Sequence, residues 1–196
     1  SCTTQLFSQT NSGMSDFWGY EVHLDDSLKT DFMFCIHKSK QLIQLAESVK
    51  RDTLHVPFRK FSEFAQAWND PHNFLHKTIN NFWFDIDEEE LVHSPSRTSF
   101  FFAPNPNHSP LALCDIVQEV LSYDEGVAEL KPAFKCLLQA ALVLPEHGKI
   151  MQVGQMKSRG EKGFRIFVQG LKKDDLKTFL DDMKYAQFYK SNYAQL

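Results

Sequence analysis

The chain has 196 residues, of which 42% are hydrophobic and 23% charged, and 18 of them are phenylalanine. This composition is typical of a globular protein and excludes a wholly disordered chain. The formal charge of −4 comes from 21 basic and 25 acidic residues without a basic block, which disfavours nucleic acid and anionic membranes as partners. We expect a single domain over residues 15–196, preceded by a polar tail over residues 1–14.

The chain carries no sequence signature of a membrane or secreted protein. Its richest apolar stretch, residues 136–144, is too short to span a bilayer and is interrupted by Gln139. The first residues lack the basic and apolar segments of a signal peptide, although a processed chain would have lost them. The four cysteines are widely spaced, without a Cys-x-x-Cys pair, so we expect reduced thiols and a cytoplasmic location.

In chain order, the first predicted unit is a strand hairpin followed by a helix. Residues 17–24 alternate between two faces, which is the period of a half-buried strand. Residues 31–37 form a second apolar strand after a polar turn. A helix is predicted next, because apolar residues recur over 42–49 at the i, i+3, i+4, i+7 spacing of an amphipathic face.

Helical spacing also marks two regions outside the hairpin units. Apolar residues at this spacing predict a helix over residues 61–68. The dipeptide Asp70-Pro71 ends it and starts a short helix through residues 72–79. A further helix is predicted around residues 134–141, between two prolines.

The pattern of two strands and a helix returns twice more. In the second copy, Ser109 is a good N-cap and Pro110 a good first helical residue. In the third copy, two glycines supply the turn between the strands, and acidic residues open the helix. The predicted segments of these two copies are residues 81–87, 99–103 and 113–120, then residues 149–156, 164–169 and 176–183.

These segments add up to about six antiparallel strands and five or six helices. We therefore predict an α+β fold in which helices pack on one face of an antiparallel sheet. The three hairpin-helix units are either pseudo-repeats that superpose in space or instances of a common α+β step. Most phenylalanines are assigned to the layer between sheet and helices, which leaves polar residues for the second face of the sheet.

This second face is the main candidate site. If the strands pair as predicted, carboxylates, an imidazole, a guanidinium and an indole project from one side, with Gln155 or its neighbours beside them. Trp and Arg are favoured anchors in recognition, whereas the alternative is a solvated face with weak cross-strand ion pairs. The candidate ligand- or partner-binding residues are Glu21, His23, Trp83, Asp85, Asp87 and Arg165.

Two patterns resemble metal sites, but neither has a complete ligand set. The acidic run from Asp85 opens like a calcium loop, yet Glu90 and Ser96 stand where such a loop needs Gly and Glu. What remains of the calcium pattern is a lone Asp-x-Asp pair, Asp85 and Asp87, as a candidate for binding a divalent ion. His72 and His76 have the i, i+4 spacing that suits a shared metal, without the Glu of the zinc-protease signature. We therefore expect no metal site.

Two smaller clusters are candidates for nucleophilic catalysis and for anion binding. Cys35 and His37 share a strand face, and a thiol with an imidazole is the minimum for nucleophilic catalysis, although such side chains point in parallel. Lys157, Arg159 and Lys162 in the glycine-bearing turn are candidate anion contacts, with a solvated charged turn as the alternative. The nucleotide, dinucleotide and serine-hydrolase signatures are missing, and we expect no cofactor.

Several short motifs are similar to those of other proteins. They are Trp83-x-Asp85-x-Asp87, Pro95-Ser96, Phe101-Phe102, Gly154-x-Met156-x-Ser158-Arg159 and Gly170-Leu171. On these motifs, the chain resembles a group of uncharacterised bacterial proteins over residues 81–185. The resemblance implies no activity, because none is known for that group.

The expected function is therefore that of a non-catalytic binding module whose partner is a protein or a small polar ligand. The alternative is a small-substrate enzyme that uses a carboxylate and His pair of the same sheet face for general acid-base chemistry. The C-terminal segment, residues 185–196, is rich in aromatic residues. It either packs back on the domain or forms an intermolecular contact, which would favour a homodimer.

Overall fold

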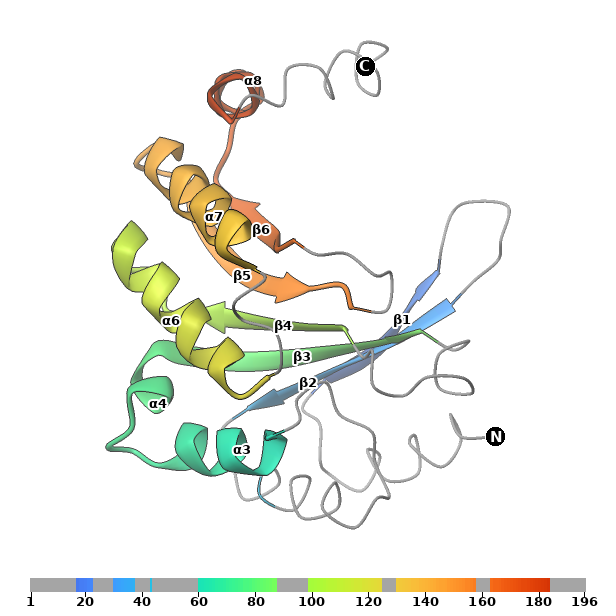
Figure 1. Cartoon of the computed structure of the whole chain (residues 1–196). Helices are drawn as coiled ribbons and strands as arrows, with labels where there is room; N and C mark the ends of the chain where they lie inside the picture. The colour runs from blue at the N-terminus through green and yellow to red at the C-terminus, as the bar shows by residue number, and fades with distance from the viewer. Residues whose placement is uncertain are drawn as a thin grey trace.

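Six antiparallel strands form one open sheet, as predicted, in the order β1-β2-β3-β4-β5-β6 (Figure 1). The computed structural model describes residues 17–22, 30–37, 43, 60–87, 99–124, 130–157 and 163–183. Each strand pairs with the strands before and after it in the chain, so β1 and β6 lie at the two edges. The strands are β1 (Phe17–Val22), β2 (Thr30–His37), β3 (Ile79–Asp87), β4 (Ser99–Pro104), β5 (Lys149–Gln155) and β6 (Arg165–Gln169).

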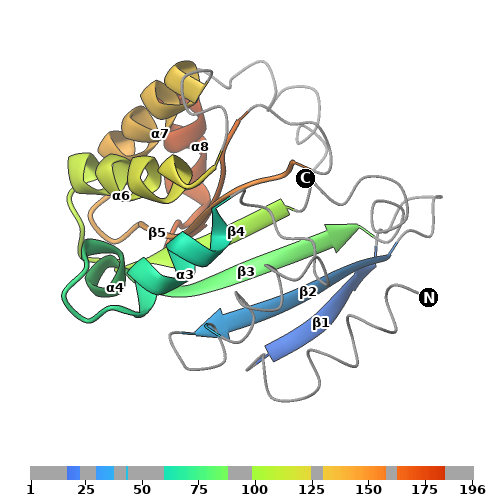
Figure 2. The ribbon, with the colours of Figure 1, turned by 60° about the horizontal axis from the view of Figure 1, so that its bottom comes forward.

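The helices α3, α6 and α7 lie on the same face of this sheet, as predicted (Figure 2). The last helix, α8, follows β6 and lies beside α7. None of the helices within the described ranges is long and apolar enough to cross a membrane. The helices are α3 (Phe61–Asn69), α4 (Phe74–Thr78), α6 (Pro110–Ser122), α7 (Lys131–Val143) and α8 (Lys173–Asp182).

Aromatic side chains fill the layer between the helices and the sheet. Alternate residues of β3 and β4 point toward the helices, which places Phe82, Phe84, Phe100 and Phe102 fully inside. The rings of Phe82 and Phe100 stack with centroids 5.5 Å apart. Trp68 of α3 is completely buried, and its indole N–H donates to the Ile79 carbonyl at 3.2 Å. The predicted assignment to this layer is therefore confirmed for these four phenylalanines.

Local capping explains where two of the helices begin. The Ser109 hydroxyl accepts a hydrogen bond from the Ala112 N–H at 3.2 Å, and Pro110 is the first residue of α6, as predicted. The side chain of Asn73 caps α4. This helix is shorter than the predicted segment 72–79, because it starts after Asn73 and because Ile79 already belongs to β3.

The interpretation of the three hairpin-helix units as pseudo-repeats, one of two alternatives, remains a prediction. The second and third hairpins are each followed by a helix, α6 and α8. The helix predicted over residues 42–49 lies outside the described residues, apart from Ile43, which is helical. The polar tail and the C-terminal aromatic segment lie outside them as well.

Candidate functional site

The strand register brings several predicted site residues to the second face of the sheet, away from α3, α6 and α7. Trp83 pairs with Phe101, Phe101 with Gly154, and Gly154 with Arg165. Cross-strand partners point to the same side, so Trp83 and Arg165 share this face, and so does Asp85 two residues along β3. Gln155 pairs with Phe100 and belongs to the helix-covered face instead.

The centre of this second face is buried rather than solvated. Asp85 is 4% exposed and Asp31, on the same face, is 2% exposed. Phe101 is also buried, and Trp83 is half-buried and donates its indole N–H to the side chain of Asn81 at 3.1 Å. The centre of this face is therefore less accessible than the sequence predicts, and Asp85 does not offer an open contact to a large partner.

Three acidic residues align across the first three strands at one end of this face. Glu21 lies opposite Asp31, and Asp31 lies opposite Asp87. The side chains of Glu21 and Asp87 and all of His23 lie outside the described residues. Among the side chains that are described, no group of His, Cys, Asp and Glu has the arrangement of a metal site.

The histidines and cysteines singled out in the sequence are engaged elsewhere or kept apart. The ring of His76 donates from Nδ1 to the Trp68 carbonyl at 2.9 Å, which fixes α4 to α3, while His72 is exposed. Cys35 is buried and His37 is exposed. Burial raises the pKa of the Cys114 thiol above its ordinary value, and the charge of the adjacent Asp115 raises it further, so this thiol is a poor nucleophile at neutral pH.

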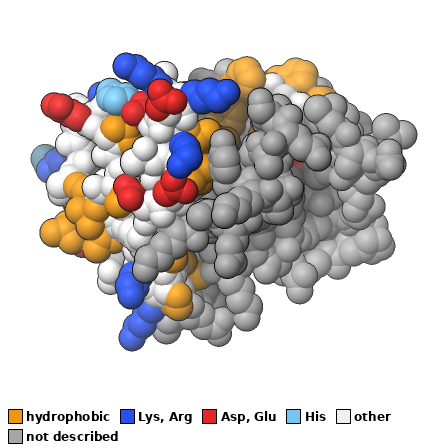
Figure 3. Space-filling model, turned by 90° about the horizontal axis from the view of Figure 1, so that it is seen from above, with side chains coloured by type: hydrophobic (Ala, Val, Ile, Leu, Met, Phe, Trp, Pro, Cys, Tyr) orange, Lys and Arg blue, Asp and Glu red, His pale blue; other side chains and the backbone are white. Residues whose placement is uncertain are grey.

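Lys157, the first of the predicted anion contacts, is bound within the protein. Its ammonium forms an ion pair with Asp124 at the end of α6 and lies 5.7 Å from the centre of the Phe100 ring. Arg159 and Lys162 lie outside the described residues. Acidic and basic side chains are interspersed on the described surface that Figure 3 shows, as the balanced composition predicts.

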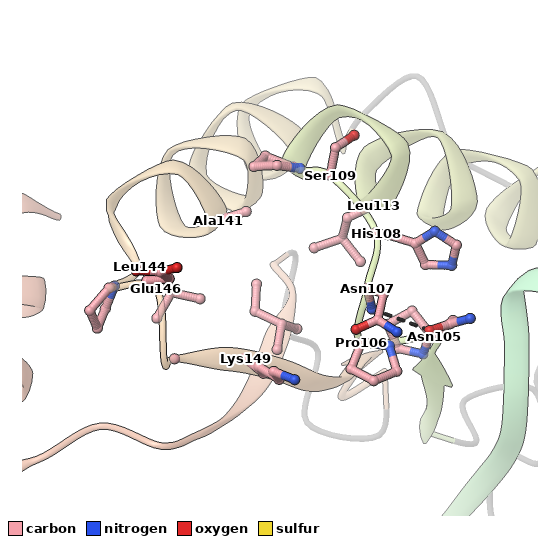
Figure 4. A pocket seen from close by; sticks show the side chains of 15 residues that line it. Asn105, Pro106, Asn107, His108, Ser109, Leu113, Ala141, Leu144, Glu146 and Lys149 are labelled. Atoms are coloured by element: carbon pink, nitrogen blue, oxygen red, sulfur yellow. Dashed lines mark hydrogen bonds between the residues drawn. The ribbon is translucent and has the colours of Figure 1, made fainter.

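A cavity of about 380 Å³ lies where two loops meet beside the sheet, and we call it the loop cavity (Figure 4). One wall is the connection from β4 to α6, residues 104–110, and the other is the connection from α7 to β5, residues 144–150. Leu113 and Ala141 reach it from the two helices. The sequence does not reveal this cavity, because its two walls lie about 40 positions apart in the chain and each loop alone has the pattern of an ordinary turn.

Hydrogen bonds within the two loops hold the walls in place. The Asn105 side chain accepts from the Asn107 N–H at 3.2 Å, and the Asn105 N–H donates to the Thr78 carbonyl at 2.8 Å. On the opposite wall, the Gly148 N–H donates to the Pro145 carbonyl at 2.8 Å. The backbone of both walls is therefore held by hydrogen bonds of the protein itself.

The ends of two helices give the loop cavity opposite electrostatic poles. Helix α6 begins at the cavity with no acidic residue in its first turn, and α7 ends there with no basic residue in its last turn. A helix N-terminus carries partial positive charge and a C-terminus partial negative charge. Neither partial charge is therefore neutralised by a side chain in the terminal turn of its own helix. Two exposed charges, Lys149 and Glu146, complete the lining.

Next to the loop cavity, a side-chain hydrogen bond fixes the start of α8. The His147 ring donates from Nε2 to Asp175 at 2.7 Å, and Asp175 also accepts from the Lys172 N–H at 2.9 Å. The hydrogen bond from His147 holds the pKa of the Asp175 carboxyl below its ordinary value, and the bond from Lys172 lowers it further. Gly170, at φ 92°, turns the chain from β6 toward α8 and lies too close to the His147 carbonyl for a Cβ.

The lowered pKa of Asp175 predicts a pH dependence of stability. The folded carboxyl binds its proton less readily than an unfolded one, whose pKa is about 3.9. Its contribution is therefore present above that value and is lost as the pH falls through the lower folded pKa. We expect Asp175→Asn to reduce Tm slightly at pH 7, with a difference from the native protein that disappears toward pH 2 in melts followed by circular dichroism.

The control for this variant is Asp174→Asn. It removes a charge from the same turn of α8 but does not touch the bond with His147. A pH-independent difference for Asp175→Asn, or an equal pH dependence of the difference for Asp174→Asn, would contradict the assignment.

Comparison of the chain with protein-family models, curated proteins and solved structures finds no match. The resemblance to uncharacterised bacterial proteins therefore remains a prediction.

Proposed function

We propose that this protein is a non-catalytic binding protein that holds a small dipolar molecule in the loop cavity. The observation that carries the proposal is the meeting of the N-terminus of α6 with the C-terminus of α7 at one cavity. Its volume of about 380 Å³ lies in the range of small-molecule sites. A ligand with separated opposite charges complements both poles, whereas a simple anion or cation complements one.

Binding is favoured over catalysis by the exposure of the charged lining. An acid-base catalyst needs a titratable group held against its substrate, away from bulk water. Glu146 and Lys149 are both exposed. The half-buried imidazole of His108 is the lining group that could serve the alternative, an enzyme. His147 lies outside the lining, and its Nε2 is directed at Asp175, where it fixes α8. The second sheet face is the weaker candidate, because Asp85 at its centre is buried.

A matched set of three compounds tests this function by thermal shift. 4-Aminobutyrate carries both charges, butyrate carries the negative charge alone, and butylamine the positive charge alone. We expect 4-aminobutyrate to raise Tm most, because it complements both poles of the cavity. A ligand at a hundred times its Kd stabilises the folded state by about 2.7 kcal/mol. Lys149→Gln should weaken this response.

Lys131→Gln is the control, because Lys131 is exposed at the opposite end of α7, outside the cavity lining. This variant should respond to 4-aminobutyrate as the native protein does. Equal shifts with all three compounds, or an undiminished response of Lys149→Gln, would rule out the dipolar ligand.

A further inference from the structure

A second cavity, of about 350 Å³, lies between α7, β6 and α8, and we call it the apolar cavity. Its described lining is apolar or glycine, apart from one thiol. The lining residues are Pro132, Ala133, Cys136, Leu137, Ala140, Gly163, Phe164, Ile166, Phe179, Leu180 and Met183. The loop cavity shares none of them, so the two cavities are separate.

Helix α8 covers this cavity without filling it. Asp175 in its first turn is bound by His147, and the carbonyl of Asp182 in its last turn accepts from the Gln139 side chain at 2.9 Å. Between these two attachments, Phe179 and Leu180 line the cavity but remain half-buried, and no residue of α8 is buried. The helix is therefore held at both ends by polar contacts, with a hollow beneath its apolar side.

The cavity is large enough for a ligand and its chemistry selects an apolar one. An apolar cavity of about 150 Å³ stays dry and binds benzene, so about 350 Å³ accommodates a larger group. The Phe134 and Phe164 rings pack edge to face, 5.2 Å apart, and support one wall. Cys136 is exposed, so its thiol can be reached by reagents from solvent.

We propose that the apolar cavity binds the apolar part of a small molecule, an alkyl or aryl group, beneath α8. The proposal is independent of the function proposed for the loop cavity. Closure of α8 onto α7 would leave no room for an added apolar group, and the test below would then show no effect of the size of that group.

The test uses Cys136 as a reporter in the full-length protein. The protein is treated with N-ethyl-, N-butyl-, N-hexyl- and N-benzylmaleimide, and rates at each cysteine are measured by peptide mapping and divided by the rate with glutathione. Each methylene that enters the cavity should raise the rate at Cys136 about threefold to fourfold, the transfer effect of one methylene. N-benzylmaleimide distinguishes an aryl from an alkyl preference.

Cys114 is the internal control, because it is half-buried on α6 outside this lining. Its normalised rate should not rise with chain length. Ala133→Phe should fill the cavity and remove the rise at Cys136 while N-ethylmaleimide still reacts, whereas Leu142→Ala, on the exposed side of α7, should preserve it. A flat dependence at Cys136 in the native protein, or an unchanged rise in Ala133→Phe, overturns the proposal.

Discussion

Replacing Phe82 with alanine is expected to lower the free energy of unfolding by about 3–5 kcal/mol. Phe82 is completely buried in the central part of the sheet. The centroid of its ring lies 5.2 Å from that of Phe64, 5.1 Å from that of Phe84 and 5.5 Å from that of Phe100. The ring therefore connects α3 with two strands. Removing the ring leaves a cavity between parts of the structure that are too constrained to close it.

Urea unfolding followed by tryptophan fluorescence measures this loss. Since domains are stable by about 5–15 kcal/mol, the variant should unfold at a much lower urea concentration. Phe74→Ala is the control, because Phe74 is 46% exposed on α4 and its removal should cost much less. A loss for Phe82→Ala no larger than that for Phe74→Ala would show that the aromatic layer is not the main source of stability.

Replacing Gly154 with alanine is expected to cost at least about 2–3 kcal/mol, in the upper range of overpacking effects. A Cβ at this position would overlap the carbonyl oxygen of Phe100 and the ring of Phe101. The carbonyl belongs to the neighbouring strand, so relief requires movement of backbone rather than of a side-chain tip. The β4–β5 pairing, which passes through Gly154, should therefore be disrupted.

The matched control is Gly163→Ala. A Cβ there meets nothing within 4 Å, and the backbone has no positive φ. Alanine at such a position should be neutral or stabilise by about 0.4–1 kcal/mol, because it restricts the unfolded chain. Thermal melts of both variants distinguish the two positions. Similar Tm values would contradict the close packing of Phe101 over Gly154.

The spacing of apolar residues predicted the fold well, because strands and helices each bury residues at a fixed local spacing. The alternation in β3 placed Phe82 and Phe84 on one side, and the Ser109-Pro110 pair located the start of α6. Burial of the second sheet face was not predicted, because it depends on what packs there and not on alternation alone. The environment of Asp85 is the clearest example.

Neither cavity was foreseen from the sequence, for the same reason. The loop cavity needs the β4–α6 connection beside the α7–β5 connection, and the apolar cavity needs α8 to cross α7 and β6. Such meetings follow from the three-dimensional path of the chain. Pro106 and Pro145 mark the two loops in the sequence, but they give no sign that the loops are neighbours.

The attachment of α8 by its two ends has a consequence for motion. No side chain of the helix is fully buried, so its release from the domain uncovers half-buried side chains only and leaves the aromatic layer intact. Local opening of a segment costs less free energy than global unfolding when few buried contacts hold the segment. A helix that detaches while the sheet stays folded gives a ligand a route into the apolar cavity and a route out.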